Sequence, residues 1–527
     1  MSDYPDSVAF LGQWGRFQQV VFFLLCASIV PNGFGAFNLV FLTDAPGHRC
    51  SVPDVGLTED WRAAIIPVQV VNGNQQLSRC SRFRLDVVRN LSAQGLVPGR
   101  DVNLTDLEQE GCVDGWSYSR DVYQSTIVSE FDLVCSEQWK LTFISTVFFV
   151  GVLLGSFFSG QLSDRFGRKP VLFLTMGVQM VFTFIQVFST SWIMFTVLLF
   201  INGLGQISNF VAALVLGTEI LTGHVRVLYS SMGACLSFTL GYMMLPGCAY
   251  LLRDWTSLLL ALSLPCLAYL PLWWFIPESP RWLLSQGRVE EAESIVRKAA
   301  KWNKVQAPLV IFQDYTVQNP NAFDLLRTSS IRITTLLLCL VTFATCTGYY
   351  GLSFNTSQLH ADPYMSCFIS AAVEVPAYIS GWLVLRYFPR RRSICCSLLL
   401  QAVSLFLIQL VPQTLPYLSI ALEMLAKYFV TITFSMMFAY IAELYPTLLR
   451  NTAVGVCSTV GRLGNCIAPF LITLNTYVLH LPYIIIGTLG CVAALAALYI
   501  PESFGQPLPE TIQQMHKRER WALYTEF

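Results

Sequence analysis

The chain has 527 residues, of which 54% are hydrophobic and only 13% are charged, and its 33 Lys and Arg residues balance 33 Asp and Glu residues. A water-soluble chain of this length would form several domains with roughly a quarter of its residues charged. The composition therefore indicates a polytopic membrane protein whose main partner is the lipid bilayer. A net charge near zero also argues against a nucleic-acid partner, because nucleic acids attract basic surfaces.

Twelve apolar runs approach the length of about 20 residues that a helix needs to cross a bilayer. The first run, 17–43, has no basic region before it and is long enough to remain as a helix, so we expect no cleavable signal peptide. We predict an all-α membrane protein with spans at 20–42, 142–162, 171–189, 193–216, 228–251, 256–276, 333–353, 364–385, 394–411, 416–441, 453–475 and 481–500.

The segment 160–169 separates the second and third spans and reads Gly-Gln-Leu-Ser-Asp-Arg-Phe-Gly-Arg-Lys. No Asp, Glu, Lys or Arg occurs in 141–163 or in 170–218, so lipid-spanning runs lie on both sides. Short loops rich in Lys and Arg stay on the cytosolic side of a membrane. We therefore expect a cytosolic loop, whereas an ordinary charged turn would require neither the glycines nor Asp164.

A long hydrophilic segment, 43–141, lies between the first two spans and is expected to be extracellular. Four cysteines in an exported segment favour two disulfides, with three connectivities left open. Two N-x-S/T sequences agree with export, and Asn355-Thr356-Ser357 falls on the same side. The residues concerned are Cys50, Cys80, Cys112 and Cys135 for disulfides, and Asn90 and Asn103 for glycosylation.

The other short loops expected in the cytosol also carry the cations, among them Arg226, Arg386, Arg390, Arg391, Arg392 and Arg450. Both termini are then cytosolic. We expect a cytosolic N-terminus at 1–19, a six-helix bundle at 20–276 that includes the extracellular loop, a cytosolic connector at 277–332, a second six-helix bundle at 333–501 and a cytosolic tail at 502–527.

Charged motifs in the first half of the chain recur in the second half, 224 residues later. Glu219 precedes Arg226 by seven residues, Glu443 precedes Arg450 by seven, and the two pairs lie 224 residues apart. Pro-Glu-Ser after span six recurs after span twelve at the same offset. Related halves predict a central cavity that is exposed alternately to the two sides as the halves rock. We assign charged groups at the inner helix ends to a cytosolic gate: Asp164, Arg165, Arg168, Glu219, Arg226, Glu443 and Arg450.

Several motifs resemble known families. The pattern G-x-L-x-D-R-x-G-R-K at 160–169 is similar to the loop between helices 2 and 3 of major facilitator superfamily transporters. Further stretches at 29–34, 112–116, 205–209, 273–283 and 442–447 resemble the organic cation/carnitine transporters of solute carrier family 22. The resemblance implies plasma-membrane transport of carnitine, ergothioneine or organic cations, coupled to sodium in the carnitine branch.

Arg462 is the only formal charge between Arg450 and Glu502, and it lies inside an apolar span. A central Arg costs about 2.5–3.5 kcal/mol on insertion scales, so it should face a cavity and find an anion. One alternative is a structural partner such as Glu374 or the cytosolic network. We favour substrate contact, because a guanidinium suits a carboxylate. The resemblance agrees, since zwitterion carriers of the family similarly have Arg here.

Aromatic side chains in spans five, seven and ten are candidates for a quaternary-ammonium cage, since such a cation cannot donate a hydrogen bond and binds aromatic faces. Any one of them is more simply a packing residue, so the cluster carries the argument. By resemblance, Phe238, Tyr349 and Phe438 match cage positions, although carnitine carriers tend to have Tyr where Phe238 and Phe438 stand. Phe434 and Asn32 complete the expected substrate residues.

Gln179, Ser208 and Asn209 are neutral polar residues in spans three and four. Their oxygens suit a hard cation, and interhelical hydrogen bonding is an equal alternative. The resemblance implicates Gln179 and Asn209 in coupling to Na⁺, although Phe210 replaces the Tyr that follows this Asn in the family. Glu423 and Lys427, four residues apart, are expected to neutralise each other.

No catalytic constellation, metal spacing or phosphate-binding loop occurs, so we expect neither an enzyme nor a cofactor. Competing interpretations are a sodium-independent, polyspecific organic cation transporter, a sugar carrier and a transport-dead sensor. The large first loop and Arg462 argue against a sugar carrier. At the C-terminus, Thr525 and Phe527 resemble a PDZ-domain ligand, which predicts a PDZ-domain partner.

Overall fold

A computed structural model of the chain describes residues 4–54, 56–71, 73–312, 322–355, 362–506, 509 and 514–515. Within these residues twelve helices are long and apolar enough to cross a membrane, which confirms the predicted number of spans. The expected PDZ ligand at Thr525 and Phe527 and most of the Asn355-Thr356-Ser357 sequence lie outside the described residues.

The first six spans are formed by α2 (Arg16–Phe37) with α3 (Leu39–Leu42), α7 (Trp139–Phe166), α8 (Arg168–Gln186), α9 (Trp192–Ile220), α10 (Gly223–Leu228) with a π-helical turn and α11 (Ala234–Leu251), and α12 (Trp255–Tyr269). The last six are α15 (Ser329–Asn355), α16 (Pro363–Tyr387), α17 (Arg390–Ile408), α18 (Pro416–Leu444), α19 (Thr447–Leu474) and α20 (Leu481–Leu498).

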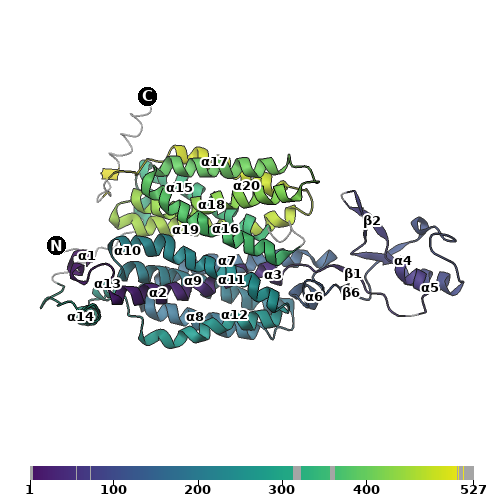
Figure 1. Cartoon of the computed structure of the whole chain (residues 1–527), viewed down its shortest axis with the longest axis horizontal. Helices are drawn as coiled ribbons and strands as arrows, with labels where there is room; N and C mark the ends of the chain where they lie inside the picture. The colour runs from purple at the N-terminus through teal and green to yellow at the C-terminus, as the bar shows by residue number, and fades with distance from the viewer. Residues whose placement is uncertain are drawn as a thin grey trace, which may run out of the picture. The chain divides into compact units, whose positions relative to one another are not determined.

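The chain divides into two units, which are described separately. The membrane unit comprises Met1–Asn38, Ile144–Leu251 and Leu259–Phe527, and the loop unit comprises Leu39–Phe143 with Leu252–Leu258. In the membrane unit, α2 packs on α9 and α11, and α15 packs on α18, α19 and α20. Helices of the second half, green to yellow in Figure 1, lie beside those of the first half, with α11 against α16.

The segment 160–169 is almost entirely helical, so the second span ends later and the third begins earlier than the predicted bounds of 162 and 171. Helix α7 continues to Phe166 and α8 begins at Arg168, so the turn consists of Gly167 alone. Gly167 has φ 100°, a conformation that side-chain-bearing residues rarely adopt. A Cβ here would also lie 2.5 Å from Glu278 Oε2, so this position requires glycine for two reasons.

The loop unit is stapled by disulfides between Cys50 and Cys112 and between Cys80 and Cys135, which selects one of the three connectivities. Three antiparallel strand pairs accompany them, β1 (His48–Cys50) with β6 (Trp116–Tyr118), β2 (Val68–Val71) with β3 (Asn74–Leu77), and β4 (Ser81–Phe83) with β5 (Gln109–Gly111). These short strands were not predicted. Short helices α4 (Glu59–Ala64), α5 (Leu85–Ala93) and α6 (Ile127–Phe131) complete the fold of this unit.

A buried arginine organises the interior of the loop unit. Arg82 is 2% exposed, donates to Glu110 Oε1 at 3.0 Å and to Asp114 Oδ2 at 2.6 Å, and reaches the Ser51 carbonyl at 2.7 Å. A buried guanidinium needs such acceptors because it cannot lose its charge. The two residues expected to carry glycans, Asn90 and Asn103, are both exposed on this unit.

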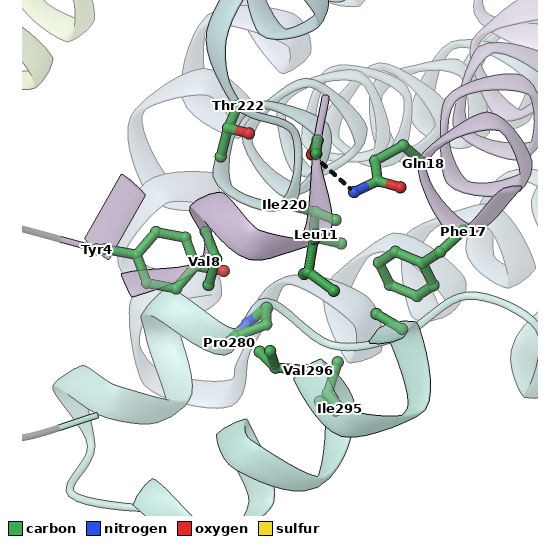
Figure 2. A pocket seen from close by; sticks show the side chains of 12 residues that line it. Tyr4, Val8, Leu11, Phe17, Gln18, Ile220, Thr222, Pro280, Ile295 and Val296 are labelled. Carbon is green, nitrogen blue, oxygen red and sulfur yellow. Dashed lines mark hydrogen bonds between the residues drawn. The ribbon is translucent and has the colours of Figure 1, made fainter. Parts of the chain in front are cut away.

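The N-terminal segment packs on the connector that follows α12. Its elements α1 (Tyr4–Ser7) and η1 (Ala9–Leu11) lie beside the connector helices α13 (Pro280–Ser285) and α14 (Val289–Asn303), around the small pocket shown in Figure 2. Asn303 holds the segment in place, because it donates to the Leu11 carbonyl at 3.2 Å and accepts from the Phe17 amide at 3.0 Å. The expected connector therefore contains the helix α14, on which the N-terminal segment packs.

Helices α2 and α11 approach closely through two glycines, and this contact yields a prediction. A Cβ on Gly241 would lie 2.1 Å from the Val30 carbonyl oxygen, and one on Gly33 would lie 2.2 Å from that of Phe238. We expect Gly241→Ala to lower the free energy of unfolding by about 1–3 kcal/mol, because backbone atoms must move apart. The measurement is the thermal midpoint of the purified protein.

Gly247→Ala is the matched control for this prediction. It lies on the same helix, and no neighbouring atom lies within 4 Å of the added Cβ. A Gly241→Ala midpoint equal to that of the control would contradict the close packing of α2 on α11.

Candidate functional site

A cavity lies between the two halves of the membrane unit. Small-molecule sites are mostly apolar with a few polar groups. Helices α2, α7, α9 and α11 of the first half and α15, α16, α18 and α19 of the second half supply its lining. The lining residues are Asn32, Ala36, Phe148, Phe149, Val152, Gln206, Ile207, Phe210, Cys235, Phe238, Tyr349, Tyr350, Tyr378, Phe434 and Arg462.

Aromatic rings dominate this lining. Of the expected cage residues, Phe238, Tyr349 and Phe434 face the cavity, and the Tyr349 and Phe434 rings stack at 5.3 Å. Phe438 contacts Phe434 edge-on at 5.7 Å but is not part of the lining. The arrangement offers several ring faces to one ligand, as binding of a quaternary ammonium requires.

Arg462 is the one formally charged residue in the lining, and it projects from α19. None of the described carboxylates forms a salt bridge with it, and Glu374, the alternative partner considered from the sequence, pairs with Lys427 instead. Asn465 lies one helical turn further along α19, is fully buried, and neither of its amide atoms has a hydrogen-bond partner among the described residues. Because it forms no salt bridge with a described carboxylate, the Arg462 guanidinium has N–H groups that can bind an anionic ligand group.

The expected pair between Glu423 and Lys427 is not formed, which corrects that prediction. Lys427 Nζ lies 3.3 Å from Glu374 Oε1, and Glu374 also accepts from Tyr349 at 2.5 Å and from Thr239 at 2.9 Å. The spacing of four residues places Glu423 and Lys427 on one face of α18. The sequence alone does not reveal that α16 supplies a competing carboxylate.

The amide residues of the first half gather on Asn32. Asn32 donates to Asn209 Oδ1 at 2.9 Å and accepts from Gln179 Nε2 at 3.5 Å, while Asn209 donates to the Leu172 carbonyl at 3.0 Å. Ser208 instead donates to the Leu204 carbonyl of its own helix at 2.8 Å. The three amide oxygens have the chemistry that a hard monovalent cation needs, provided that the amides turn from one another toward the ion.

The lining residues that sequence reasoning missed include Phe148, Phe149, Gln206 and Tyr378. Gln206 could have been found from the sequence, because it is a further neutral polar residue beside Ser208 and Asn209. In the structure it donates to the Asn32 carbonyl at 3.0 Å. The aromatic residues had no distinguishing signal, because 13% of the chain is aromatic and each such residue by itself resembles a lipid-facing or packing side chain.

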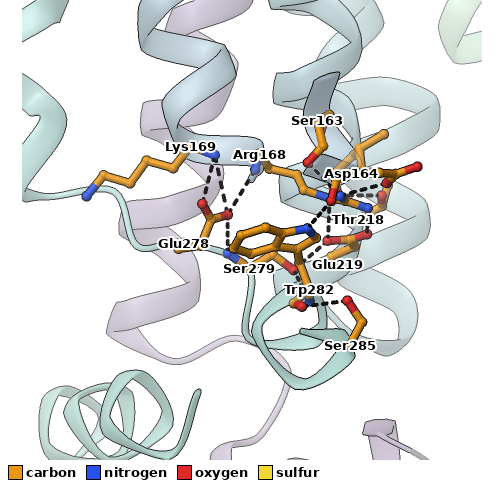
Figure 3. Close-up of polar contacts among 11 residues, drawn as sticks. Ser163, Asp164, Arg168, Lys169, Thr218, Glu219, Glu278, Ser279, Trp282 and Ser285 are labelled. Carbon is orange, nitrogen blue, oxygen red and sulfur yellow. Dashed lines mark hydrogen bonds and ion pairs between the residues drawn. The ribbon is translucent and has the colours of Figure 1, made fainter. Parts of the chain in front are cut away.

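The charged residues assigned to a gate form a network at the connector end of the first half (Figure 3). Arg168 donates to both carboxylate oxygens of Glu219, at 3.0 and 3.2 Å, and pairs with Asp164 at 2.8 Å. Glu278 accepts from the backbone amides of Arg168 and Lys169, at 3.2 and 3.3 Å. Burial raises the pKa of the Glu278 carboxyl, and these donors oppose the shift.

The second half repeats this network. Arg390 pairs with Glu443 at 3.1 Å, its backbone amide donates to Glu502 at 3.0 Å, and Ser503 donates to Glu443 at 2.8 Å. Arg390 therefore takes the place of Arg168. The Arg168–Glu219 pair lies within the first half, and the Arg390–Glu443 pair lies within the second.

The remaining gate residues take no part in these ion pairs. Arg165 is exposed and lies over the Phe166 ring, and Arg450 donates to the Ala442 carbonyl at 2.7 Å. Arg226 lies in α10 and forms no salt bridge with the described carboxylates.

The opposite end of the two halves is closed by aromatic and polar contacts. Phe37 of α2 stacks on Tyr350 of α15 at 5.8 Å, and Phe149 of α7 contacts Phe354 at 5.6 Å. Thr239 of α11 donates to Glu374 of α16, which joins the halves at mid-depth. These contacts join the halves toward the end where α2 finishes, whereas no ion pair between described residues joins the two charged networks at the connector end.

Comparisons with known proteins give consistent results. A family model described as "Sugar (and other) transporter" matches residues 109–515. The chain is 53% identical to organic cation/carnitine transporter 2 of Rattus norvegicus, a match that covers 98% of this chain and 94% of that protein. It is 51% identical to solute carrier family 22 member 4 of Mus musculus, covering 98% and 95%, and 33% identical to organic cation transporter protein of Drosophila melanogaster, covering 97% and 94%.

Among solved structures, the fold is similar to that of the E. coli xylose transporter XylE. The partially occluded inward-open form gives a TM-score of 0.61 at 14% identity, over 93% of this chain and all of that one. The inward-open form gives 0.59 at 13% identity, over 94% and 98%. At this identity the likeness establishes the fold, which is the major facilitator fold predicted from the sequence.

The network around Arg168 yields a second prediction. Arg168→Lys keeps the charge but loses the planar fork that holds both Glu219 oxygens and the Ser163 carbonyl. Because a hydrogen bond to a charged group contributes about 1.5–3 kcal/mol, we expect a lower thermal midpoint of unfolding. Arg165→Lys is the matched control, since Arg165 is exposed and lies three residues earlier. Equal midpoints for the two variants would refute the structural role of the fork.

Proposed function

Because the chain belongs to the organic cation/carnitine transporters of solute carrier family 22, we propose that it carries small zwitterionic or cationic quaternary ammonium compounds, similar to carnitine or ergothioneine, by alternating access. The observation that carries the proposal is the combination of an aromatic cavity with one guanidinium in its lining, that of Arg462, which forms no salt bridge with the described carboxylates. The rings suit an ammonium group and the guanidinium suits a carboxylate. A zwitterion satisfies both.

The proposal includes coupling to sodium. Its support is the cluster of Asn32, Gln179 and Asn209, whose side-chain amides hydrogen-bond to one another beside the cavity. A sodium ion would be held by those oxygens, and Asn32 would link it to the substrate, because Asn32 also lines the cavity. A sodium-independent facilitator of organic cations is the alternative, favoured by Phe210, which lines the cavity where the family has a hydroxyl.

We also propose that the conformation described here is the one open to the cytosol of a plasma-membrane protein with both termini inside. The halves are joined by Phe37, Tyr350 and Glu374 away from the connector end, and the ion networks at the connector end are not joined to each other. Arg168 and Arg390, at the connector end, obey the positive-inside rule. In the opposite conformation, the two networks would meet and close the cavity to the cytosol.

Uptake of labelled carnitine, ergothioneine and tetraethylammonium, measured in parallel with sodium and with its replacement, tests the proposal. We expect the zwitterions to be taken up and to require sodium. Uptake of tetraethylammonium alone, independent of sodium, would establish the alternative, and uptake of none of the three would overturn both.

The role of Arg462 yields a third prediction. Arg462→Lys should lower carnitine uptake about 10- to 100-fold at unchanged surface expression, because the bidentate hydrogen bonds, at about 1.5–3 kcal/mol, are lost. Uptake of tetraethylammonium, which has no carboxylate, should be retained. Arg332→Lys, at an exposed position at the start of α15, is the control. If carnitine uptake by Arg462→Lys equals that of the control, Arg462 does not contact the substrate.

A further inference from the structure

A fully buried carboxyl group outside the cavity forms no salt bridge with any cation in the described part of the chain. Glu423 projects from α18 with no exposed surface, and its Oε2 accepts a hydrogen bond from Tyr483 of α20 at 3.0 Å. Its Oε1 has no partner among the described residues. Asn355 of α15 donates to the same Tyr483 hydroxyl at 2.7 Å, and its own Oδ1 is also unpartnered among the described residues. Two buried acceptors at one site therefore lack a donor.

The nearby cation cannot supply that donor, because its hydrogen-bonding capacity is used elsewhere. Lys427 has three N–H groups. Its Nζ lies 3.3 Å from Glu374 Oε1 and donates to Ser370 Oγ at 3.1 Å and to Ser353 Oγ. Glu374 in turn has donors on both oxygens. Glu374 and Lys427 thus form a complete ion pair, from which Glu423 is left out.

The buried cluster then contains two carboxyl groups, those of Glu374 and Glu423, but only one ammonium group, that of Lys427. Glu374, Lys427 and Glu423 are all fully buried within spanning helices, and the other ionisable group that faces Glu423 is the Tyr483 phenol. An isolated ionised carboxylate in such surroundings costs many kcal/mol, and the group becomes neutral instead. A proton is the ligand that removes the charge and also provides the missing donor.

We propose that Glu423 is a proton-binding site, which carries a proton on Oε1 while Lys427 is paired with Glu374. The O–H group satisfies Oε1 and has in Asn355 Oδ1 an unpartnered acceptor within the same hydrogen-bonded cluster. Oε2 then becomes the carbonyl oxygen of the acid and keeps the hydrogen bond from Tyr483.

The site is linked to the cavity through Lys427. The Lys427 ammonium lies 4.8 Å from the ring of Tyr349, a cavity residue, and Lys427 shares one face of α18 with Glu423. When a cationic ligand group displaces Lys427 from Glu374, Lys427 turns to Glu423, whose proton leaves to water. This link to turnover rests on the proposed function, whereas the proton site itself does not.

Infrared spectroscopy of the purified, ligand-free full-length protein tests the site without any transport measurement. A protonated carboxylic acid has a carbonyl stretch that an ionised carboxylate lacks. We expect such a band at neutral pH in the wild type and its loss in Glu423→Gln. Glu290→Gln, at an exposed position of α14, is the matched control and should retain it. Absence of the band in the wild type, or a band unchanged by Glu423→Gln, would overturn the proposal, and a sodium-sensitive carboxylate signal in its place would indicate a sodium site instead.

Two further variants test the geometry. Tyr483→Phe should shift the band to higher frequency, because the carbonyl oxygen loses its hydrogen bond, while a merely structural role would leave the frequency unchanged. Glu374→Gln should abolish the band, because Lys427 then has only Glu423 to neutralise. Persistence of the band in Glu374→Gln would refute the link through Lys427. Failure of uptake of both carnitine and ergothioneine, by contrast, would overturn the proposed function and leave the infrared result intact.

Discussion

A bilayer offers no partner to a buried charge, so each charge within the spanning helices must be satisfied by other parts of the protein. Glu374 shows how this constraint shapes the molecule. It accepts hydrogen bonds from Tyr349 and Thr239 and pairs with Lys427. Thr239 belongs to the first half and the other residues to the second. The carboxylate that Lys427 neutralises within the second half therefore also joins the halves, through its hydrogen bond from Thr239.

Arg462 obeys the same constraint in a different way. It lines the cavity and has no salt bridge with any carboxylate in the described part of the chain. A charged side chain with a purely structural role should have a partner for each of its donors, as Lys427 has. The contrast between the saturated Lys427 and the open Arg462, both carried by helices of the second half, is the physical basis for assigning Arg462 to a ligand.

The two halves pair the charged residues at their helix ends in the same way. In each, an arginine at the start of a helix pairs with a glutamate at the end of another, and a Pro-Glu-Ser segment caps the arginine's helix. Arg168 and Glu219 form the first such pair, and Arg390 and Glu443 form the second. Because carboxylates near a helix N-terminus interact favourably with its dipole, Glu278 and Glu502 stabilise the starts of α8 and α17. Two self-contained networks of this kind leave each half free to move as one body.

The number of spans and the division into halves follow from the sequence by itself, because hydropathy over about 20 residues and repeats at a fixed offset are properties of the chain. The isolated charge at Arg462 and part of the aromatic lining, namely Phe238, Tyr349 and Phe434, were also predictable, whereas Phe148, Phe149 and Tyr378 had no distinguishing signal. Only the tertiary structure decided which carboxylate holds Lys427. Spacing along α18 places Glu423 within reach, but α16 brings Glu374 closer in space, and an ammonium with three donors already engaged has none left for a second carboxylate.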